Sequence, residues 1–399
     1  MINRIIFVSF QGIRNGIPQG MNKMIMPLFE ECSYTNSTLI VGNIFGKRAS
    51  FIHNNIKPNG NGGFNFLITI ISVFNRLFLK KKSYVLRFYS EVLFDLIFSL
   101  HINQPSIIIS SAYLFYSQKR NKKKGGINIL ISGNPDDRDI NALLLKEQQI
   151  HQVMFEDAYM FEQRLNFISK SIDHFDHIVT FSSVTFNSFS NRIPKIRLSK
   201  INYHITPNTR IFEFKSEEKK NKLVFCFISN PFWLKGFYYL LEAWSTVNSG
   251  YAELVIGGSI NVDLQEIINA RFADLKNVKY LGWVNDINMF YRSAHIAIIP
   301  SLLDAGPTTV SEAMYCGVPV IVSDGCGSSE LVRNGENGFI VPSGNSSAIA
   351  SKIRWFLSNP QRVKEMGDNA AKSIMKIMKS NQNQQLVNHV FGVVKELQK

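Results

Sequence analysis

The sequence has few cysteines and no apolar stretch long enough to cross a bilayer. Its 399 residues include four cysteines, and no two form a C-x-x-C pair. We therefore expect neither a disulfide frame nor a structural metal site, as in a reduced cytosolic protein. The longest apolar segment, residues 64–78, falls short of the ~20 residues that span a bilayer. No cleavage site of small residues follows the apolar start of the chain, so no signal peptide is predicted.

Charged residues are also sparse, and the positive ones are concentrated in one half. With 45% hydrophobic and 19% charged residues, the composition is that of a globular protein. Residues 1–210 hold 25 Lys and Arg against 13 Asp and Glu, whereas the remainder holds 19 against 17. A basic N-terminal half predicts an anionic partner: phosphates, a nucleic acid or an acidic membrane surface. No zinc-finger spacing or RNP-like strand is found, so a nucleic acid is not expected.

Short apolar runs alternate with helical patterns along the first 200 residues. Strands are predicted at residues 5–10, 38–41, 106–110, 127–131, 152–155 and 177–181. Helices are predicted between them, including residues 21–31, 67–79, 83–100 and 140–149. This alternation predicts an α/β domain with a doubly wound parallel sheet.

A proline followed by a charge run interrupts this alternation near residue 210. We predict an N-terminal domain at residues 1–208, a linker at 209–221, a second domain at 222–380 and a C-terminal helix at 381–399 that can cross back to the first domain. The second domain has predicted strands at residues 223–229, 252–256, 278–281, 296–300 and 318–322, with a helix at 236–247. Two such α/β domains place a ligand cleft between the carboxyl ends of their strands.

The stretch 299–341 carries the most specific pattern. Asp304 and Glu312 are separated by seven residues and enclose Gly306, Pro307, Thr308 and Thr309 at a predicted helix start. The amides and dipole of such a helix can hold a diphosphate, and the carboxylates can accept hydrogen bonds from sugar or ribose hydroxyls. The alternative is that Asp304 is a helix N-cap and Glu312 a surface glutamate.

Further candidates follow other strands of the second domain. Lys235 precedes Gly236 at a helix start, where its charge could meet a diphosphate; the alternative is a solvated lysine beside a helix cap. Gly257 ends a strand and allows close approach of the backbone. Trp283 and Val284 end the next strand, where their backbone could bind a nucleobase. A tryptophan packed under a loop is the alternative there.

Two features of the N-terminal half are less specific. A glycine-containing loop after the first strand includes Gly16 and Gly20 and is either a phosphate or acceptor loop or a simple turn. The apolar and basic residues from 64 to 87, with the lysines of 119–124, could lie on an anionic bilayer. Core helices with solvated lysines at their ends are the alternative.

The second domain closely resembles the family 4 glycosyltransferases, retaining enzymes of the GT-B fold. The resemblance rests on NVKYLGWVNDINMFYRSAHIAIIPSLLDAGPTTVSEAMYCGVPVIVSD, on ELVRNGENGFIV and on LKGFYYLLEAW, and it is strong over residues 223–360. It implies sugar transfer from a nucleotide-diphosphate donor with retention of configuration and without a required metal or other cofactor.

The resemblance also implies roles for individual residues. Asp304 and Glu312 match the two acids of the E-x7-E pattern, which contact the donor sugar and the ribose, respectively. Lys235 matches the lysine that stabilises the departing diphosphate, and residues 306–309 match the loop that contacts the distal phosphate. Three positions depart from the family: Asp304 replaces a glutamate, Asn230 replaces an arginine among the donor-binding residues, and Glu156 or Asp157 takes the place of a histidine.

The function implied is that of a hexosyltransferase in bacterial lipopolysaccharide, capsule or exopolysaccharide synthesis. Its expected partners are a nucleotide sugar, a glycan or lipid-linked acceptor and an anionic membrane surface, but no nucleic acid. The expected location is the cytoplasm, with peripheral attachment at the inner face of the membrane. The alternatives are a non-hydrolysing sugar-nucleotide epimerase and a non-catalytic sugar-nucleotide-binding subunit.

Overall fold

The computed structural model describes residues 83–208 apart from 112, residues 222–399 apart from 230–232, 248 and 261, and short pieces of the first 58 residues. These pieces are residues 2, 4–9, 13–14, 17–18, 22–30, 32, 36–41, 44–45 and 56–58. The chain forms two compact units. Unit 1 comprises Met1–Thr180, Phe186–Ile201 and Gln382–Lys399, and unit 2 comprises Phe181–Thr185 and Asn202–Asn381.

Unit 1 is built on a parallel sheet whose seven strands have the order β10-β9-β8-β7-β1-β4-β6. These strands are β1 (Arg4–Ser9), β4 (Asn36–Val41), β6 (Ile56–Pro58), β7 (Ile107–Ser110), β8 (Ile127–Ser132), β9 (His177–Thr180) and β10 (Leu198–Lys200). Strands β7 and β8 are buried along their whole length, as expected where helices cover both faces of a sheet. A small second sheet joins β3 (Ile17–Pro18), β2 (Ile13–Arg14) and β5 (Ile44–Phe45).

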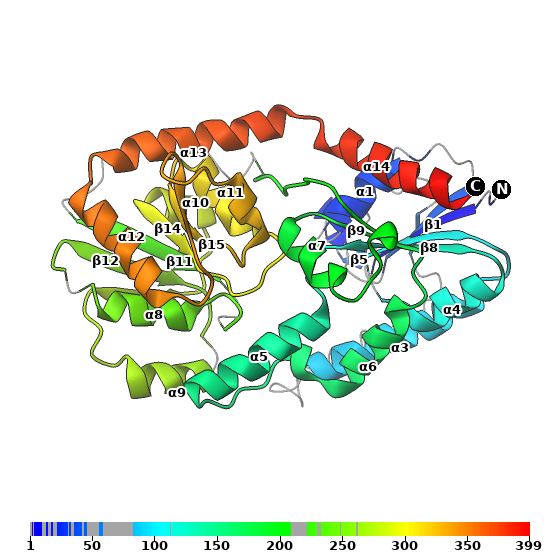
Figure 1. Cartoon of the computed structure of the whole chain (residues 1–399), viewed down its shortest axis with the longest axis horizontal. Coiled ribbons are helices and arrows are strands. Elements are labelled where there is room, and N and C mark those ends of the chain that lie inside the picture. The colour runs from blue at the N-terminus through cyan, green and yellow to red at the C-terminus, as the bar shows by residue number, and fades with distance from the viewer. Residues whose placement is uncertain are drawn as a thin grey trace. The chain divides into compact units, whose positions relative to one another are not determined.

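The helices of unit 1 include its C-terminal segment. They are α1 (Asn22–Glu30), α3 (Ser83–Leu100), α4 (Phe115–Lys123), α5 (Asp137–His151), α6 (Glu162–Ile172), α7 (Ser183–Ser190), which starts in unit 2, and α14 (Gln382–Leu397), with 3-10 turns η1 (Ala158–Met160) and η2 (Lys195–Arg197). Helix α14 lies beside α1 (Figure 1), and the Gln398 side chain donates to the Ile2 carbonyl over 3.1 Å. The last helix is therefore part of unit 1.

Unit 2 contains a parallel sheet of six strands in the order β13-β12-β11-β14-β15-β16. The strands are β11 (Leu223–Ile228), β12 (Ala252–Gly257), β13 (Val278–Gly282), β14 (Ile296–Ile299), β15 (Val320–Ser323) and β16 (Gly338–Val341). The helices are α8 (Phe237–Ser245), α9 (Val262–Arg271), α10 (Ile287–Arg292), α11 (Thr308–Tyr315), α12 (Ser346–Ser358) and α13 (Arg362–Lys379), with the 3-10 turn η3 (Gly327–Leu331).

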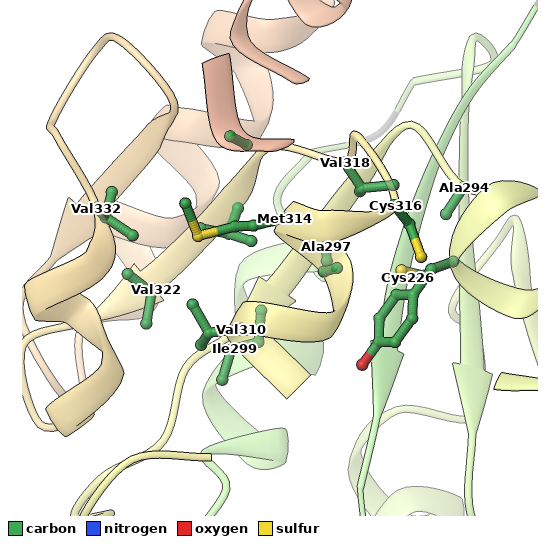
Figure 2. Close-up of a cluster of buried hydrophobic side chains, with 14 of the residues drawn as sticks. Cys226, Ala294, Ala297, Ile299, Val310, Met314, Cys316, Val318, Val322 and Val332 are labelled. Atoms are coloured by element: carbon green, nitrogen blue, oxygen red, sulfur yellow. The ribbon is translucent and has the colours of Figure 1, made fainter. Parts of the chain in front are cut away.

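Alternate residues of β11 face two different helical layers. Val224 and Cys226 belong to a buried cluster with residues of α10, α11 and α13, whereas Phe225 and Phe227 pack against Trp244 and Phe237 of α8. Figure 2 shows part of the first cluster, in which Val310 and Met314 of α11 lie near β14 and β15. This packing fixes α11 against the sheet and so positions its N-terminus.

The structure confirms most predicted strands and corrects one. Strands predicted at residues 5–10, 38–41, 106–110, 127–131 and 177–181 correspond to β1, β4, β7, β8 and β9, and the predicted helix 83–100 is α3. The strand predicted at 152–155 is wrong: β8 pairs directly with β9, and Gln152 ends α5 in the left-handed conformation. The predicted helix 67–79 and the predicted linker 209–221 lie outside the described residues.

Strands β2, β3, β5, β6, β10 and β16 were not predicted. All are short: β2, β3 and β5 have two residues, β6 and β10 three, and β16 four. Among the described helices, none is both long and apolar enough to cross a membrane.

Candidate functional site

The site in unit 2 is built on the carboxyl edge of its sheet. Because the strands are parallel, the segments that follow β11, β12, β13, β14 and β15 all leave the sheet at this edge. These segments contain the described candidate residues of unit 2 from Lys235 to Pro307, and Glu312 follows in α11. Asn230 lies outside the described residues.

The turn before α8 packs closely against the loop after β14. Gly236 has a φ of 70°, and a Cβ at this position would lie 1.9 Å from the Pro300 carbonyl oxygen. The amide of Leu302 donates to the Leu234 carbonyl over 2.8 Å. Only glycine permits this approach, which brings Lys235 next to the loop that carries Asp304.

Lys235 and Asp304 form an ion pair. The Lys235 ammonium donates to Oδ2 of Asp304, and Oδ1 of the same carboxylate accepts from the Gly306 amide over 3.2 Å. The side chains are partly exposed, at 27% for Lys235 and 14% for Asp304. Lys235 thus lies beside the cap of α8, as in the alternative interpretation, but its ammonium is paired with a carboxylate. The N-cap alternative for Asp304 is wrong, because α11 begins after Pro307 and has no side-chain cap.

A glycine-containing loop after β15 holds the backbone of Asp304 through hydrogen bonds. The Asp304 amide donates to the Gly325 carbonyl over 2.9 Å, and the Asp304 carbonyl accepts from the Gly327 amide over 2.8 Å. A Cβ on Gly325 would lie 2.2 Å from the Leu302 oxygen, and one on Gly327 would lie 1.8 Å from the Ala305 oxygen. These two glycines were not among the predicted site residues, although their spacing around Cys326 after a buried strand was available in the sequence.

Cys326 lies in this loop, between the two glycines, and its buried thiol stays protonated. Burial raises the pKa of the Cys326 thiol, and the charge of Asp304 raises it further. The backbone of Cys326 forms an isolated parallel bridge with Asp304. Cys326 therefore helps to hold the loop and is a poor nucleophile, since the thiolate is the reactive form.

Helix α11 presents its N-terminus beside the ion pair. Gly306 and Pro307 precede the helix, and Thr308 and Thr309 form its first turn. All four residues are half-buried. The Ser328 hydroxyl donates to the Pro307 carbonyl over 3.1 Å, so the loop after β15 also fixes this end of α11. The partial positive charge of a helix N-terminus and the nearby ammonium of Lys235 make this region suited to an anion.

Glu312 lies one turn further along α11 and is half-buried. Its charge helps to raise the pKa of the fully buried Tyr291 phenol, although burial is the larger cause. At a rise of about 1.5 Å per residue, Glu312 is about 6 Å along the helix from Thr308. The structure thus brings Lys235, Asp304 and the start of α11 together, with Glu312 on the same short helix.

Gly257 and the Trp283 segment lie at the ends of neighbouring strands. A Cβ on Gly257 would lie 2.8 Å from a methyl carbon of Val284, so the glycine makes room for this side chain. The Gly258 amide donates to the Gly282 carbonyl over 2.7 Å. The Trp283 side chain is 71% exposed, so the alternative of a tryptophan packed under a loop is wrong.

Glu156 and Asp157 belong to unit 1 and follow α5. The Tyr84 hydroxyl donates to Oε2 of Glu156 over 3.0 Å, and Asp157 caps the turn η1 by accepting from the Tyr159 amide over 3.0 Å. Burial raises the pKa of the Asp157 carboxyl. The other unit 1 candidates, Gly16 and Gly20, lie outside the described residues, as do residues 64–82 of the apolar and basic tract.

Arg164 supports this acidic segment and was missed in the sequence. Its guanidinium lies 5.3 Å from the centre of the Tyr159 ring and donates through Nε to Asp137 over 3.0 Å. Asp137 is 1% exposed, and burial raises its pKa despite the opposing effect of Arg164. The run PDDRD after β8 is the sequence feature that could have indicated a buried ion pair here.

Comparison with known proteins gives a family match for the second unit. Residues 208–373 match the family model described as glycosyl transferases group 1. The D-rhamnosyltransferase WbpZ of Pseudomonas aeruginosa is 31% identical over 160 residues, which are 38% of this chain and 41% of the relative. The UDP-Gal:alpha-D-GlcNAc-diphosphoundecaprenol alpha-1,3-galactosyltransferase of Escherichia coli is 26% identical over 188 residues, 45% of each chain. The chain thus spans about half or less of the length of these curated relatives.

The fold likeness extends over both units. The lipopolysaccharide outer core galactosyltransferase WaaB matches with a TM-score of 0.63 and 18% identity, covering 98% of this chain and 99% of that one. At this identity the match shows the fold, which is the predicted α/β GT-B architecture with two parallel sheets. The similarity to the glycosyl transferases group 1 model is confined to residues 208–373.

Proposed function

We propose that this protein is a retaining glycosyltransferase that moves a sugar from a nucleoside-diphosphate donor to a glycan or lipid-linked acceptor in bacterial surface-polysaccharide synthesis. The observation that carries this proposal is the grouping of Lys235, Asp304 and the Gly306 amide at the start of α11. The family match and the lipid-linked acceptor in the name of the Escherichia coli relative support it. The same proposal places the transfer reaction at the cytoplasmic face of a membrane.

The chemical task of such a site is to stabilise a departing nucleoside diphosphate. The ammonium of Lys235 and the N-terminal amides of α11 would carry this charge, and fixed donors of this kind are the largest catalytic contribution in many enzymes. Glu312 would bind the ribose hydroxyls and the segment of Trp283 and Val284 the base. The acceptor hydroxyl would attack from the face that the diphosphate leaves, and no metal or enzymic nucleophile is invoked.

Asp304 has a second role in this proposal. In the structure its carboxylate accepts from Lys235 and from the Gly306 amide, which are the donors that a phosphate would use. Donor binding would therefore exchange one anion for another at this position. The exchange would free Asp304 to accept from a hydroxyl of the donor sugar.

The proposal is tested by incubating the purified protein with a panel of nucleotide sugars and synthetic lipid-linked acceptors. Transfer should consume one donor and give a product whose anomeric configuration by NMR equals that of the donor. Inverted product would contradict the retaining mechanism. Interconversion of the donor without an acceptor would support the epimerase instead, and donor binding without any turnover would support the non-catalytic subunit.

A further inference from the structure

The 3-10 turn η3 holds two parts of the candidate site. The Gly327 amide donates to the Asp304 carbonyl over 2.8 Å, and the Ser328 hydroxyl donates to the Pro307 carbonyl over 3.1 Å. Asp304 is the partner of Lys235, and Pro307 immediately precedes α11. The place of η3 therefore determines where both the carboxylate and the start of the helix lie.

The start of α7 packs against η3. Oε1 of Glu330, a residue of η3, accepts from the Ser183 amide over 2.7 Å. A Cβ on Gly327 would lie 2.4 Å from the Ser182 hydroxyl oxygen. Residues Phe181–Thr185 belong to unit 2, although the residues before and after them belong to unit 1. This short segment is thus attached to unit 2 next to the loop that holds Asp304.

A carboxylate is well suited to hold this segment. Ser183 is the first residue of α7, so its amide has no acceptor within the helix, and the positive end of the helix dipole attracts a negative charge. The Ser182 hydroxyl accepts from the Thr185 amide over 3.3 Å, which leaves the Ser183 amide to Glu330. Glu330 is exposed, so its replacement opens no cavity in the core.

The body of α11 is held by other contacts. Val310 and Met314 are buried in the cluster between α11 and the sheet, and the Ser311 hydroxyl donates to the Ile205 carbonyl over 2.9 Å. Loss of the bond to Glu330 should therefore displace the loop before α11 more than the helix itself. Glu312, which follows Ser311 in α11, should keep its place.

We propose that Glu330 is a positioning residue for the diphosphate, because it fixes η3 on the start of α7 and thereby holds Asp304, the Gly306 amide and the start of α11. The inference rests on the proposed function for the identity of the anion. Since Glu330 acts on the loop and not on Glu312, it supports the contacts to the distal phosphate and not those to the ribose.

Calorimetric titration with nucleoside diphosphates and monophosphates tests this role. Of UDP, GDP, ADP, CDP and dTDP, the nucleotide that the unchanged protein binds should bind Glu330→Ala about three- to tenfold more weakly. The affinity for its monophosphate should not change. Glu330→Gln should restore most of the diphosphate affinity, because an amide oxygen can still accept from Ser183. Glu336→Ala is the matched control: the Glu336 side chain is 62% exposed and pairs with Arg333, and its loss should change neither affinity.

Hydrogen–deuterium exchange of the backbone amides in residues 304–309 tests the positioning without any ligand. Exchange should be faster in Glu330→Ala and the same as in the unchanged protein in Glu330→Gln and Glu336→Ala. Thermal unfolding checks that each variant is folded.

Three results would overturn the inference: equal exchange in Glu330→Ala and the unchanged protein, a diphosphate affinity of Glu330→Ala that is unchanged or falls no more than the monophosphate affinity, or a Glu330→Gln variant that binds as weakly as Glu330→Ala. If the unchanged protein binds none of the five nucleotides, the proposed function fails, and the exchange measurement alone then decides on Glu330.

Discussion

The two units hold their candidate residues by different means. In unit 2 the candidate residues are held mainly by backbone hydrogen bonds. Asp304 is fixed by backbone bonds to Gly325 and Gly327, at positions where a Cβ would collide with neighbouring carbonyls. In unit 1 they are held by side chains: Tyr84 donates to Glu156, and Arg164 connects Tyr159 to the buried Asp137.

This difference explains why the sequence of one unit is easier to interpret than that of the other. A site fixed by backbone contacts requires glycines and helix starts at set spacings, so it leaves a pattern in the sequence. A site fixed by paired side chains can be built from many combinations of residues far apart in the chain. It follows that unit 2 should tolerate few changes in its loops, whereas unit 1 should tolerate paired changes.

The largest effect is expected from Lys235→Ala. Loss of the ammonium removes one donor for the departing diphosphate, and removal of a single such group lowers turnover by about 10²–10³-fold. Initial rates of sugar transfer under donor saturation measure this. Lys235→Arg should retain part of the activity because it keeps the charge. If Lys235→Ala transfers sugar at the unchanged rate, Lys235 does not stabilise the departing diphosphate.

Arg164→Met tests the side-chain network of unit 1. It leaves the buried carboxylate of Asp137 without its cation, at a cost of about 3 kcal/mol in the free energy of unfolding. Removal of the guanidinium should raise the Asp137 pKa further, so the folded protein binds more protons and the variant should lose stability as the pH rises. Urea unfolding at several pH values measures both effects.

The double variant Asp137→Asn with Arg164→Met should recover most of this stability, because the carboxylate that lost its cation is then replaced by an uncharged amide. Equal stabilities of the single and double variants would show that the pair is not coupled, and the contrast between the two units would be lost.

Gly327→Ala tests the backbone of unit 2. The added Cβ would meet the Ala305 oxygen at 1.8 Å, and relief of such a contact costs about 1–3 kcal/mol. Gly306→Ala is the matched control in the same loop system, since its nearest neighbour would be the Ser328 hydroxyl at 3.2 Å. Thermal unfolding should show a clear loss for Gly327→Ala and a small one for Gly306→Ala. The reverse order would contradict the arrangement of these loops.

The smallest effect is expected from Asp304→Asn on binding of the nucleoside diphosphate. The Asp304 carboxylate accepts from Lys235 and from the Gly306 amide and so competes with the diphosphate for these donors. Removal of its charge should therefore tighten binding of the nucleoside diphosphate by about two- to fivefold. Sugar transfer should fall at the same time, since the sugar contact is weakened. Calorimetric titration gives the affinity, and weaker binding in the variant would exclude the proposed exchange of anions.

Much of unit 2 could be predicted from the sequence, because a site held by backbone contacts requires glycines and helix starts at set spacings. Its strands are short apolar runs with glycine or proline after them, and Asp304, Pro307 and Glu312 lie at spacings that only a loop followed by a helix accommodates. Strand β16 was missed because it is four residues long and starts at Gly338, which appeared to belong to the preceding turn.

The errors in unit 1 have a different cause. Residues 152–155 are apolar enough for a strand, but Phe155 uses its carbonyl to accept from the Gln148 side chain over 2.7 Å, and β8 and β9 leave no place between them. Arg164 was missed because its partner Asp137 is 27 residues away. Partners at such distances are determined by the fold and leave no local pattern.

Calorimetric titration of the unchanged protein and of Lys235→Ala with UDP, GDP, ADP, CDP and dTDP tests the central claim most directly. The claim is that Lys235 and the start of α11 hold the diphosphate of a nucleotide sugar. One of these nucleotides should bind the unchanged protein, and Lys235→Ala should weaken that binding by at least about tenfold. If none of them binds, or if both proteins bind the same nucleotide equally well, the site is not where a nucleoside diphosphate is held.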